Sequence, residues 1–564
     1  MEKMRKMNFM FILTMVSIFL INLTMVIAGE TIDIVTFNDF HGNVAEDTRD
    51  WGKNLGMSKM VAKINDMRKN NPNTIVVSGG DNYQGTAISN LTYGAPVSNM
   101  MKALGVTASA VGNHEFDWGR DYIAKWAKDG NFDYLAANIY DTKTNKPVKW
   151  AKPYKIIEKA GIKIALIGLA HPDTVTLTKV ENVTGLEFRD PVKVAQEWIN
   201  FLKAGKAKEG TPDVIIAVTH LDSQQDSKTK EIKGTAVTLA EGVTGLDAIV
   251  SAHSHRTVSG KVNGVAIVQA YKYGRALGLI SIKVDDNGKV SEINESVNNV
   301  YKIKNDIIPD STAEVALDEY KAKLNPILNE IVGVAEGEFT HSRKEDNVSV
   351  LGEWVCEVMA EKAGTEIAIQ NGGGLRRSLY AGNITMGDLY EVMPYDNQLV
   401  KMKLSGKDIR AAIDHGILNP SITDGSFSGL KVLFDRDAEF ENRILAITLK
   451  DGTPLENDKY YSVVVNDFMY GGGDKYDFSN AKDVIDTFVP IRTVLIDAIK
   501  KTGKIVPKKV DVIAEAKSYI IAAGDVLGKI AKEHNVTVKE IVGFNNIENS
   551  DLIFAGEKIL LPVE

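Results

Sequence analysis

The sequence predicts an α/β protein in which a layered α/β domain precedes an α+β domain and a small βααβ unit. Short apolar, β-rich runs alternate with longer helical patterns through residues 30–305. Several runs are continuously apolar, which is typical of strands covered on both faces. A charged helical pattern over 306–334 predicts a linker, residues 335–508 the second domain, and residues 517–563 the βααβ unit. The predicted strands of the first domain cover 32–37, 74–79, 108–112, 162–169, 213–219, 246–251 and 265–270.

The composition argues against disulfides, cysteine-rich zinc modules and binding to nucleic acid. The 564-residue chain has one cysteine, Cys356, so neither an intramolecular disulfide nor a cysteine-rich zinc module can form. Its net charge of −8 gives the whole chain no electrostatic preference for a nucleic acid polymer. We therefore expect no nucleic acid partner.

The first residues, 1–28, predict an export signal. Lys3, Arg5 and Lys6 precede a long apolar run that ends at Ala28, as in secretory signal peptides. Cleavage after this alanine is the favoured outcome, and the alternative is an uncleaved anchor, because the run is nearly long enough to span a bilayer. No later stretch approaches that length, so no transmembrane span is expected after cleavage. Export without disulfides is more typical of a bacterial wall or periplasm than of a eukaryotic secreted protein.

Side chains that bind metals follow the predicted strands of the first domain. The loops at the carboxyl ends of strands in α/β sheets converge on one crevice. We therefore expect separate strand ends to supply Asp, Asn and His to one place. These side chains are Asp39 and His41, Asp81, Asn113 and His114, His220, and His253 with His255.

This set predicts a site for two divalent metal ions. Paired ions lie about 3.5–4 Å apart, and they activate a water molecule for hydrolysis. Such a pair needs a carboxylate between the ions, and Asp81, alone at its strand end, is the predicted bridge. Mixed nitrogen and oxygen ligands suit Zn²⁺, Mn²⁺, Co²⁺ or iron better than Ca²⁺ or Mg²⁺. Asp39, His41 and His255 are predicted to complete the coordination of one ion. Asn113, His220 and His253 are predicted to complete that of the other.

His114 is predicted to act beside the metal ions as an acid. It would hydrogen-bond either a phosphate oxygen or the leaving group, with Asp117 orienting its imidazole ring. The spacing of three residues between the two side chains is the basis of this pairing.

Five short motifs contain these side chains: NDFHG (38–42), GGDNYQG (79–85), GNHEFDWG (112–119), TH (219–220) and SAHSH (251–255). Their ordered series resembles the calcineurin-like metallophosphoesterases and, more narrowly, the bacterial 5′-nucleotidase/UDP-sugar hydrolase family. The resemblance implies a four-layer α/β/β/α metallophosphoesterase domain followed by a nucleotide-binding domain. Ala252 stands where the family has glycine, a departure that removes no ligand.

The resemblance continues into the second domain and implies its substrate contacts. Its motifs are NGGGLR (371–376), PYDNQLV (394–400), SGLKVLFD (428–435) and NDFMYGGGDKY (466–476). A Phe-x-Gln run that the family commonly carries is replaced here by TDGSFSGL (423–430), which affects the assignment of the first stacking residue. By resemblance, Arg376 holds the substrate phosphate, Phe427 and Tyr476 sandwich the base, and Asn397 and Asp474 contact the nucleoside.

The linker is expected to act as a hinge. In the family that the chain resembles, the substrate domain can swing relative to the metal domain, and the helical pattern at 311–333 lies between them. Pro326 falls inside this pattern and predicts a kink or a break.

The tail has the pattern of a small, self-contained module. A strand over 518–522 leads to Gly524 and Asp525, and a helix with an apolar face follows. Thr537 and Glu540 have the spacing of a capping box at the start of a second helix. This pattern resembles a LysM module, which binds the N-acetylglucosamine chains of peptidoglycan, and the alternative is an unrelated structural cap on the enzyme.

The sequence thus predicts an exported two-metal 5′-nucleotidase that is tethered to the cell wall. A 2′,3′-cyclic-nucleotide 2′-phosphodiesterase/3′-nucleotidase and a UDP-sugar hydrolase remain open, because the metal motifs barely separate these reactions. A non-catalytic wall-binding protein is disfavoured by the intact series of ligands. The resemblance gives nucleotides as substrates, and peptidoglycan or N-acetylglucosamine chains as the partner of the tail.

Overall fold

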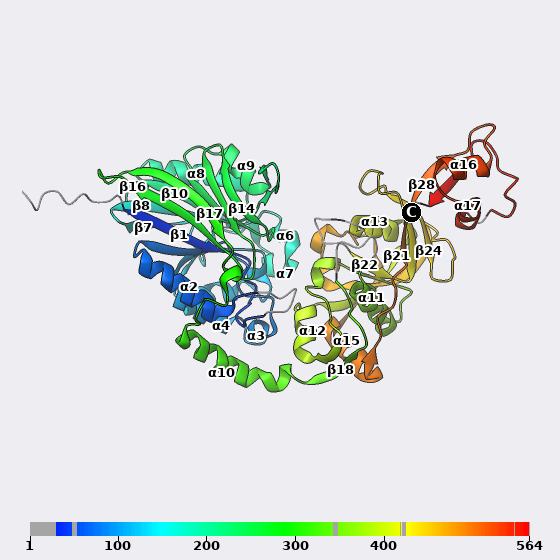
Figure 1. Ribbon diagram of the computed structural model, residues 1–564, viewed down its shortest axis with the longest axis horizontal. Coiled ribbons are helices and arrows are strands. Elements are labelled where there is room, and N and C mark those ends of the chain that lie inside the picture. Colours follow the sequence, from blue (N-terminus) through cyan, green and yellow to red (C-terminus); the bar gives the residue numbers. More distant parts are fainter. Residues whose placement is uncertain are drawn as a thin grey trace, which may run out of the picture.

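A computed structural model describes residues 30–47, 54–341, 348–417, 419, 425–545 and 547–562. The predicted export signal lies outside these residues. Figure 1 shows the first domain and the second domain side by side, with helix α10 below the first domain and leading toward the second, and the tail beyond the second domain. None of the helices in the described ranges has the length and apolar character that a bilayer span requires.

The first domain contains two six-stranded sheets packed face to face. Apolar side chains such as Ile34, Val77, Leu166 and Ile216 fill the space between the sheets. All seven predicted strands are confirmed, and their pairings within each sheet are parallel. They are β1 (Thr31–Phe37), β2 (Thr74–Ser78) and β3 (Val106–Ala110) in one sheet, and β8 (Ile162–Leu169), β10 (Val214–Asp222), β13 (Ala248–Ala252) and β15 (Val265–Ala270) in the other.

Helices cover the outer face of each sheet and complete four α/β/β/α layers, as predicted. Helix α8 starts where its sequence indicates, because Pro191 occupies the first turn and Asp190 accepts hydrogen bonds from two backbone N–H groups. One apolar cluster packs between helices and the first sheet, and another between helices and the second. The main covering helices are α2 (Gly56–Asn70), α4 (Ala95–Leu104) and α5 (Asp121–Gly130) on one side, and α8 (Pro191–Lys203) and α9 (Thr235–Gly242) on the other.

The strands toward the sheet edges are not among the predicted ones. Most of them pair antiparallel with their neighbours and are only partly buried, so they lack the continuous apolar runs of the central strands. These outer strands are β4 (Asp133–Leu135), β7 (Tyr154–Lys159), β14 (Thr257–Val262), β16 (Leu277–Val284) and β17 (Val290–Asn298). Of these, β4 is the exception in its pairing, since it runs parallel to β3.

The linker is one helix, α10 (Ser311–Leu328), whose first turn is capped by the side chain of Asp310. The helix continues through Pro326 and ends two residues later, so the proline lies in its last turn. Helix α10 contacts α2 and α4 of the first domain and α12 of the second. It therefore touches both domains rather than spanning solvent between them.

The second domain is built on a five-stranded and a three-stranded sheet, with separate apolar clusters on either side. Helix α11 (Val350–Ala363) packs on the larger sheet. The other helices are α12 (Met386–Val392), α13 (Gly406–Gly416), α14 (Asp467–Tyr470) and α15 (Ile491–Thr502). The strands are β18 (Ile331–Ala335), β19 (Ile367–Gln370), β20 (Gly382–Thr385), β21 (Gln398–Ser405), β22 (Ser426–Ser428), β25 (Tyr460–Asn466), β26 (Lys482–Pro490) and β27 (Lys504–Ile505).

The tail is joined to the second domain by a shared strand. Strand β28 (Ile513–Ile520) first pairs parallel with β23 (Leu430–Phe434) of the second domain. It then pairs antiparallel with β29 (Lys558–Pro562) of the tail. Helices α16 (Leu527–Glu533) and α17 (Val538–Asn545) complete the predicted βααβ unit, and the capping box is confirmed by the mutual hydrogen bonds of Thr537 and Glu540.

Candidate active site

The predicted ligands of the first domain meet at one edge of its two sheets. Most of them stand in turns after the strands, whereas His220 lies near the end of β10. Several take up backbone angles that side chains rarely adopt. Such strain persists where the surrounding structure enforces it, and it is common at functional sites. Asp39, His41, Asp81, His253 and His255 all have φ between 48° and 68°.

The first group of ligands consists of Asp39, His41 and His255. His255 Nε2 lies 3.3 Å from Asp39 Oδ1, and His41 Nε2 lies 3.9 Å from the same oxygen. The two imidazole nitrogens lie 3.2 Å apart. Their ligand atoms lie close enough together to surround a single ion.

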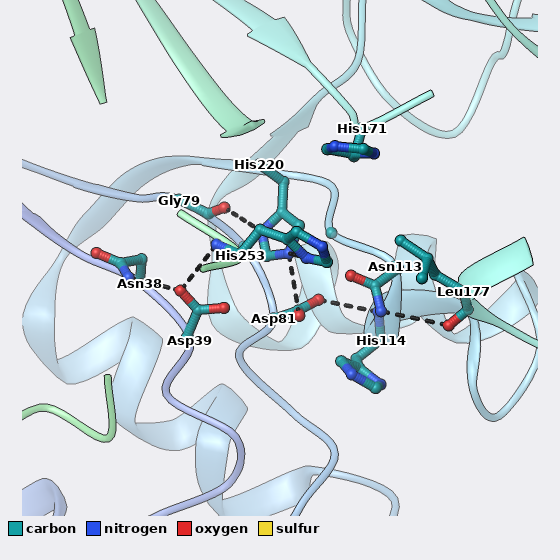
Figure 2. Close-up of polar contacts among 12 residues, drawn as sticks. Asn38, Asp39, Gly79, Asp81, Asn113, His114, His171, Leu177, His220 and His253 are labelled. Atoms are coloured by element: carbon teal, nitrogen blue, oxygen red, sulfur yellow. Dashed lines mark hydrogen bonds and ion pairs between the residues drawn. The ribbon is translucent and has the colours of Figure 1, made fainter. Parts of the chain in front are cut away.

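Asp81 stands between this group and a second group that contains His220 and His253. Its Oδ2 atom lies 3.9 Å from His41 Nε2 and 3.0 Å from His220 Nε2. His253 Nδ1 lies 3.3 Å from His220 Nε2, and Asn113 lines the same cavity as Asp81. Figure 2 shows the carboxylate of Asp81 between His220, His253 and Asn113. Asp81 therefore faces both groups of ligands, which is the position that the predicted bridge requires.

The donor atoms fit a pair of divalent cations. Asp39 Oδ1 and Asn113 Oδ1 are buried without a hydrogen-bond partner among the described residues, and buried oxygens normally have one. Burial alone would lower the pKa of His220, but the carboxylates of Asp81 and Asp39 outweigh burial and raise it to about 10. The carboxylates thus require positive charge, which divalent ions supply when bound.

His114 and Asp117 form the predicted pair beside these ligands. His114 Nδ1 lies 2.8 Å from Asp117 Oδ2, so Nε2 is left for the cavity that both residues line. The backbone N–H of His114 also donates to Asp81 Oδ1 at 2.9 Å. Burial favours the neutral ring, but the Asp117 and Asp81 carboxylates outweigh it and raise the pKa of His114. This arrangement suits a proton donor.

Glu115 fixes the loop that carries Asp81, a role that sequence reasoning missed. Its carboxylate accepts hydrogen bonds from the backbone N–H groups of Asp81 at 2.8 Å, Asn82 at 2.9 Å and Gly112 at 2.7 Å. A Cβ atom at Gly112 would lie 2.1 Å from Asp81 Oδ1, so only glycine fits there. The motif quoted above contained both residues, but only the fold shows what they hold.

His171 is a second residue to which the sequence assigned no role. Its ring centroid lies 5.0 Å from that of His253, and its Nε2 atom lies 3.6 Å from Asp222 Oδ1. Figure 2 shows the His171 ring lying above that of His253. Its Nδ1 accepts the backbone N–H of Asp173, which fixes the ring at the edge of the ligand group.

A cavity of about 750 Å³ connects the ligand groups to the second domain. Arg376, Asn397 and Asp474 line it from the second domain, as the resemblance implies. Asp474 Oδ2 accepts a hydrogen bond from Asn371 Nδ2 at 2.7 Å, which holds its carboxylate on the cavity wall. Three of the five predicted substrate contacts are therefore brought to the ligand groups.

Phe427 and Tyr476 do not line this cavity. Their exposed fractions are 2% and 3%, and both belong to the apolar core of the second domain. Tyr476 stacks on Phe478 with ring centroids 5.9 Å apart. A base in the cavity cannot lie between these rings in this arrangement, because both are enclosed by core side chains. The predicted sandwich does not agree with this arrangement of the chain.

Contacts across the cavity hold the two domains together. Lys179 of the first domain donates to Asp467 of the second at 2.8 Å, and Lys475 of the second donates to Asp173 of the first at 2.7 Å. The ring of Tyr395, from the second domain, stacks against that of His114 with centroids 5.8 Å apart. Side chains of both domains therefore face the same space.

Three family patterns match the chain in order. The calcineurin-like phosphoesterase pattern matches residues 32–257, and the 5′-nucleotidase C-terminal domain pattern matches residues 331–481. The LysM domain pattern matches residues 519–562.

Relatives match most of this chain. Endonuclease YhcR of Bacillus subtilis is 30% identical over 77% of this chain, and the chain spans only 37% of that protein's length. A 5′-nucleotidase of Vibrio parahaemolyticus is 30% identical over 78% of this chain and 83% of that protein. Cell wall protein Lmo0130 of Listeria monocytogenes is 24% identical over 93% of this chain and 74% of that protein.

A solved structure shares the fold of the two large domains. The 5′-nucleotidase precursor from Thermus thermophilus superposes with a TM-score of 0.74 at 26% identity, covering 86% of this chain and 99% of that one. The ligand groups, the second domain that faces them and the relative from Vibrio all indicate the same family. This chain therefore belongs to the 5′-nucleotidase family of calcineurin-like, metal-dependent phosphoesterases.

Proposed function

We propose that this protein is an exported 5′-nucleotidase that releases phosphate from nucleoside 5′-phosphates at the cell wall. The observation that carries the proposal is the position of Asp81 between two groups of His and Asp side chains, on a cavity that Arg376 reaches from the second domain. Uncatalysed hydrolysis of phosphate monoesters is extremely slow, and paired cations with an aligned nucleophile address that barrier.

The geometry supports the following proposed roles. Two divalent cations, held by the seven ligands already named, would neutralise the phosphate and activate water. His114 Nε2 donates a proton or hydrogen bond to the reacting phosphate ester, while Asp117 holds the ring through Nδ1. Arg376 binds phosphate oxygens, and Asn397 and Asp474 contact the nucleoside.

Metal removal tests this function. We expect protein treated with a chelator to lose phosphate release from AMP, and we expect Mn²⁺, Zn²⁺ or Co²⁺ to restore it better than Mg²⁺. Stripped protein that keeps full activity would contradict the two-metal proposal. Metal content measured by mass spectrometry separates failure to bind metal from failure to react.

The same preparation decides among the related reactions. We expect AMP to be hydrolysed faster than 3′-AMP, 2′,3′-cyclic AMP and UDP-glucose. Faster hydrolysis of the cyclic nucleotide or of the sugar nucleotide would replace the 5′-nucleotidase assignment by the corresponding alternative. A metal-loaded protein that is inert toward all four would favour a non-catalytic protein.

Retention in the cell wall is the second part of the proposal. It is supported by the signal-like residues 1–28, the LysM pattern and the cell wall protein of Listeria. We expect the full mature chain to sediment with purified peptidoglycan and to carry its AMP hydrolysis into the pellet. Oligomers of N-acetylglucosamine should release it, and chitin beads serve as the comparison. Protein that stays in the supernatant would contradict the proposed retention in the cell wall.

A further inference from the structure

The turn that follows β15 is strained in a way that the roles assigned so far do not use. Tyr271 and Tyr273 have φ of 59° and 58°, so both residues that flank Lys272 are left-handed. Three hydrogen bonds hold them: Tyr271 N donates to Arg256 O at 3.0 Å, Asn38 Nδ2 donates to Tyr271 O at 2.7 Å, and Tyr273 N donates to Asp39 O at 2.9 Å. The ligand-bearing loop of Asp39 thus fixes this turn.

The turn places Lys272 and Tyr273 on the cavity wall, next to the first group of ligands. The ring of Tyr273 lies 6.0 Å from that of His41 and 6.2 Å from that of His255, measured between centroids. The Lys272 ammonium lies 4.6 Å from the Tyr273 ring centroid. Attraction between an ammonium and an aromatic face at this range limits where the lysine side chain can go.

Two cations at the cavity have no carboxylate within ion-pair distance among the described residues. Among the described residues, neither the Lys272 ammonium nor the Arg376 guanidinium forms an ion pair with a carboxylate, although both are partly buried. Fully buried charges are almost always paired, so an unpaired cation at the half-buried wall of a cavity is available to bind an anion. The two cations come from different domains, and both line the cavity that contains His255.

We propose that Lys272 is a substrate-binding residue that acts with Arg376 to hold the doubly charged phosphate of a monoester. This inference rests on the proposed function and names its substrate class. A phosphate monoester carries two negative charges near neutral pH, whereas a phosphodiester carries one. Two unpaired cations beside the ligands therefore favour the monoester over the diester. A lysine that served only to pack on Tyr273 would need neither the strained turn nor a place on the cavity wall.

Replacing Lys272 by Gln tests the proposal in the metal-loaded protein. We expect kcat/KM for AMP to fall about tenfold, mainly through KM, because one charge-assisted hydrogen bond is lost. Hydrolysis of bis(p-nitrophenyl) phosphate, a singly charged diester, should change less than about twofold. The diester has only one negative charge and therefore gains little from a second cation. Lys272→Arg should recover most of the AMP activity because it keeps the charge.

Lys128→Gln is the matched control, because Lys128 is exposed on α5 and lies off the cavity. This variant should hydrolyse both substrates at the wild-type rate. Equal losses on the monoester and the diester in Lys272→Gln, or no loss on either, would overturn the proposal.

A binding measurement keeps the proposal separate from the proposed function. Inorganic phosphate should raise the melting temperature of the metal-loaded wild type and of Lys128→Gln, and about tenfold more phosphate should be needed for Lys272→Gln. This result is obtainable even if AMP is not the substrate. Identical phosphate dependence in the three proteins would show that Lys272 does not bind phosphate.

Discussion

Replacing Asp81 by Asn is expected to lower kcat/KM for AMP about a thousandfold or more, equivalent to about 4 kcal/mol of transition-state stabilisation. Asp81 Oδ2 lies within 3.9 Å of both His41 and His220, so it is the carboxylate that faces both groups of ligands. Removing its charge leaves each group with fewer anionic ligands and no shared one. The rate of phosphate release from AMP and the metal content of the purified variant are the two measurements.

The choice of asparagine separates charge from packing. The Asp81→Asn side chain keeps its shape and an oxygen that can accept the hydrogen bond from the His114 backbone N–H, which Asp81 Oδ1 accepts now. We therefore expect a melting temperature close to that of the wild type when both are free of metal. A variant that keeps wild-type activity and metal content would show that Asp81 does not bridge two ions.

Replacing His114 by Gln is expected to lower kcat for AMP about 10²- to 10³-fold while metal content stays unchanged. The ring is held by Asp117 through Nδ1, which leaves Nε2 as the donor toward the cavity. A Gln side chain can donate a hydrogen bond but cannot transfer a proton. Steady-state kinetics on AMP measures the loss.

The leaving group distinguishes the two roles predicted for His114. p-Nitrophenolate leaves without a proton, so a variant that lacks only the proton donor should lose much less activity on p-nitrophenyl phosphate than on AMP. Equal losses on both substrates would indicate that His114 binds a phosphate oxygen instead. Asp117→Asn should show the same pattern with a smaller loss, because it weakens the orientation and lowers the pKa of a ring that is still present. Wild-type kcat in His114→Gln would contradict both roles.

The metal site could be predicted from the sequence because its residue types are distinctive and its positions follow from strand ends. Asp39, Asp81 and His220 each come at the end of a buried apolar strand, and such ends meet at one edge of an α/β sheet. The separation of the seven central strands into two sheets could not be predicted in this way. Strands of both sheets have the same continuous apolar pattern, and only their pairing distinguishes them.

The substrate side was less predictable, for different physical reasons. Phe427 and Tyr476 are aromatic residues, and an aromatic ring suits a core as well as a nucleobase. Lys272 belongs to a residue type that is common on surfaces, and its importance depends on the left-handed turn around it. Glu115 stands in a motif of metal ligands, yet its carboxylate binds backbone N–H groups instead. These roles depend on tertiary contacts that residue type alone does not specify.

The predicted strand of the tail started too late, and the reason has a mechanical consequence. Residues 513–515 of β28 pair with β23 of the second domain before the strand continues into the tail. Arg436 and Glu515 add an ion pair across that junction. A force applied to the tail along β28 is therefore transmitted to the second domain through the hydrogen bonds between β28 and β23, and not through a flexible linker. A glycan bound to the tail would hold the second domain, which bears Arg376. If the predicted hinge at α10 operates, the metal-bearing first domain is therefore the part that would turn.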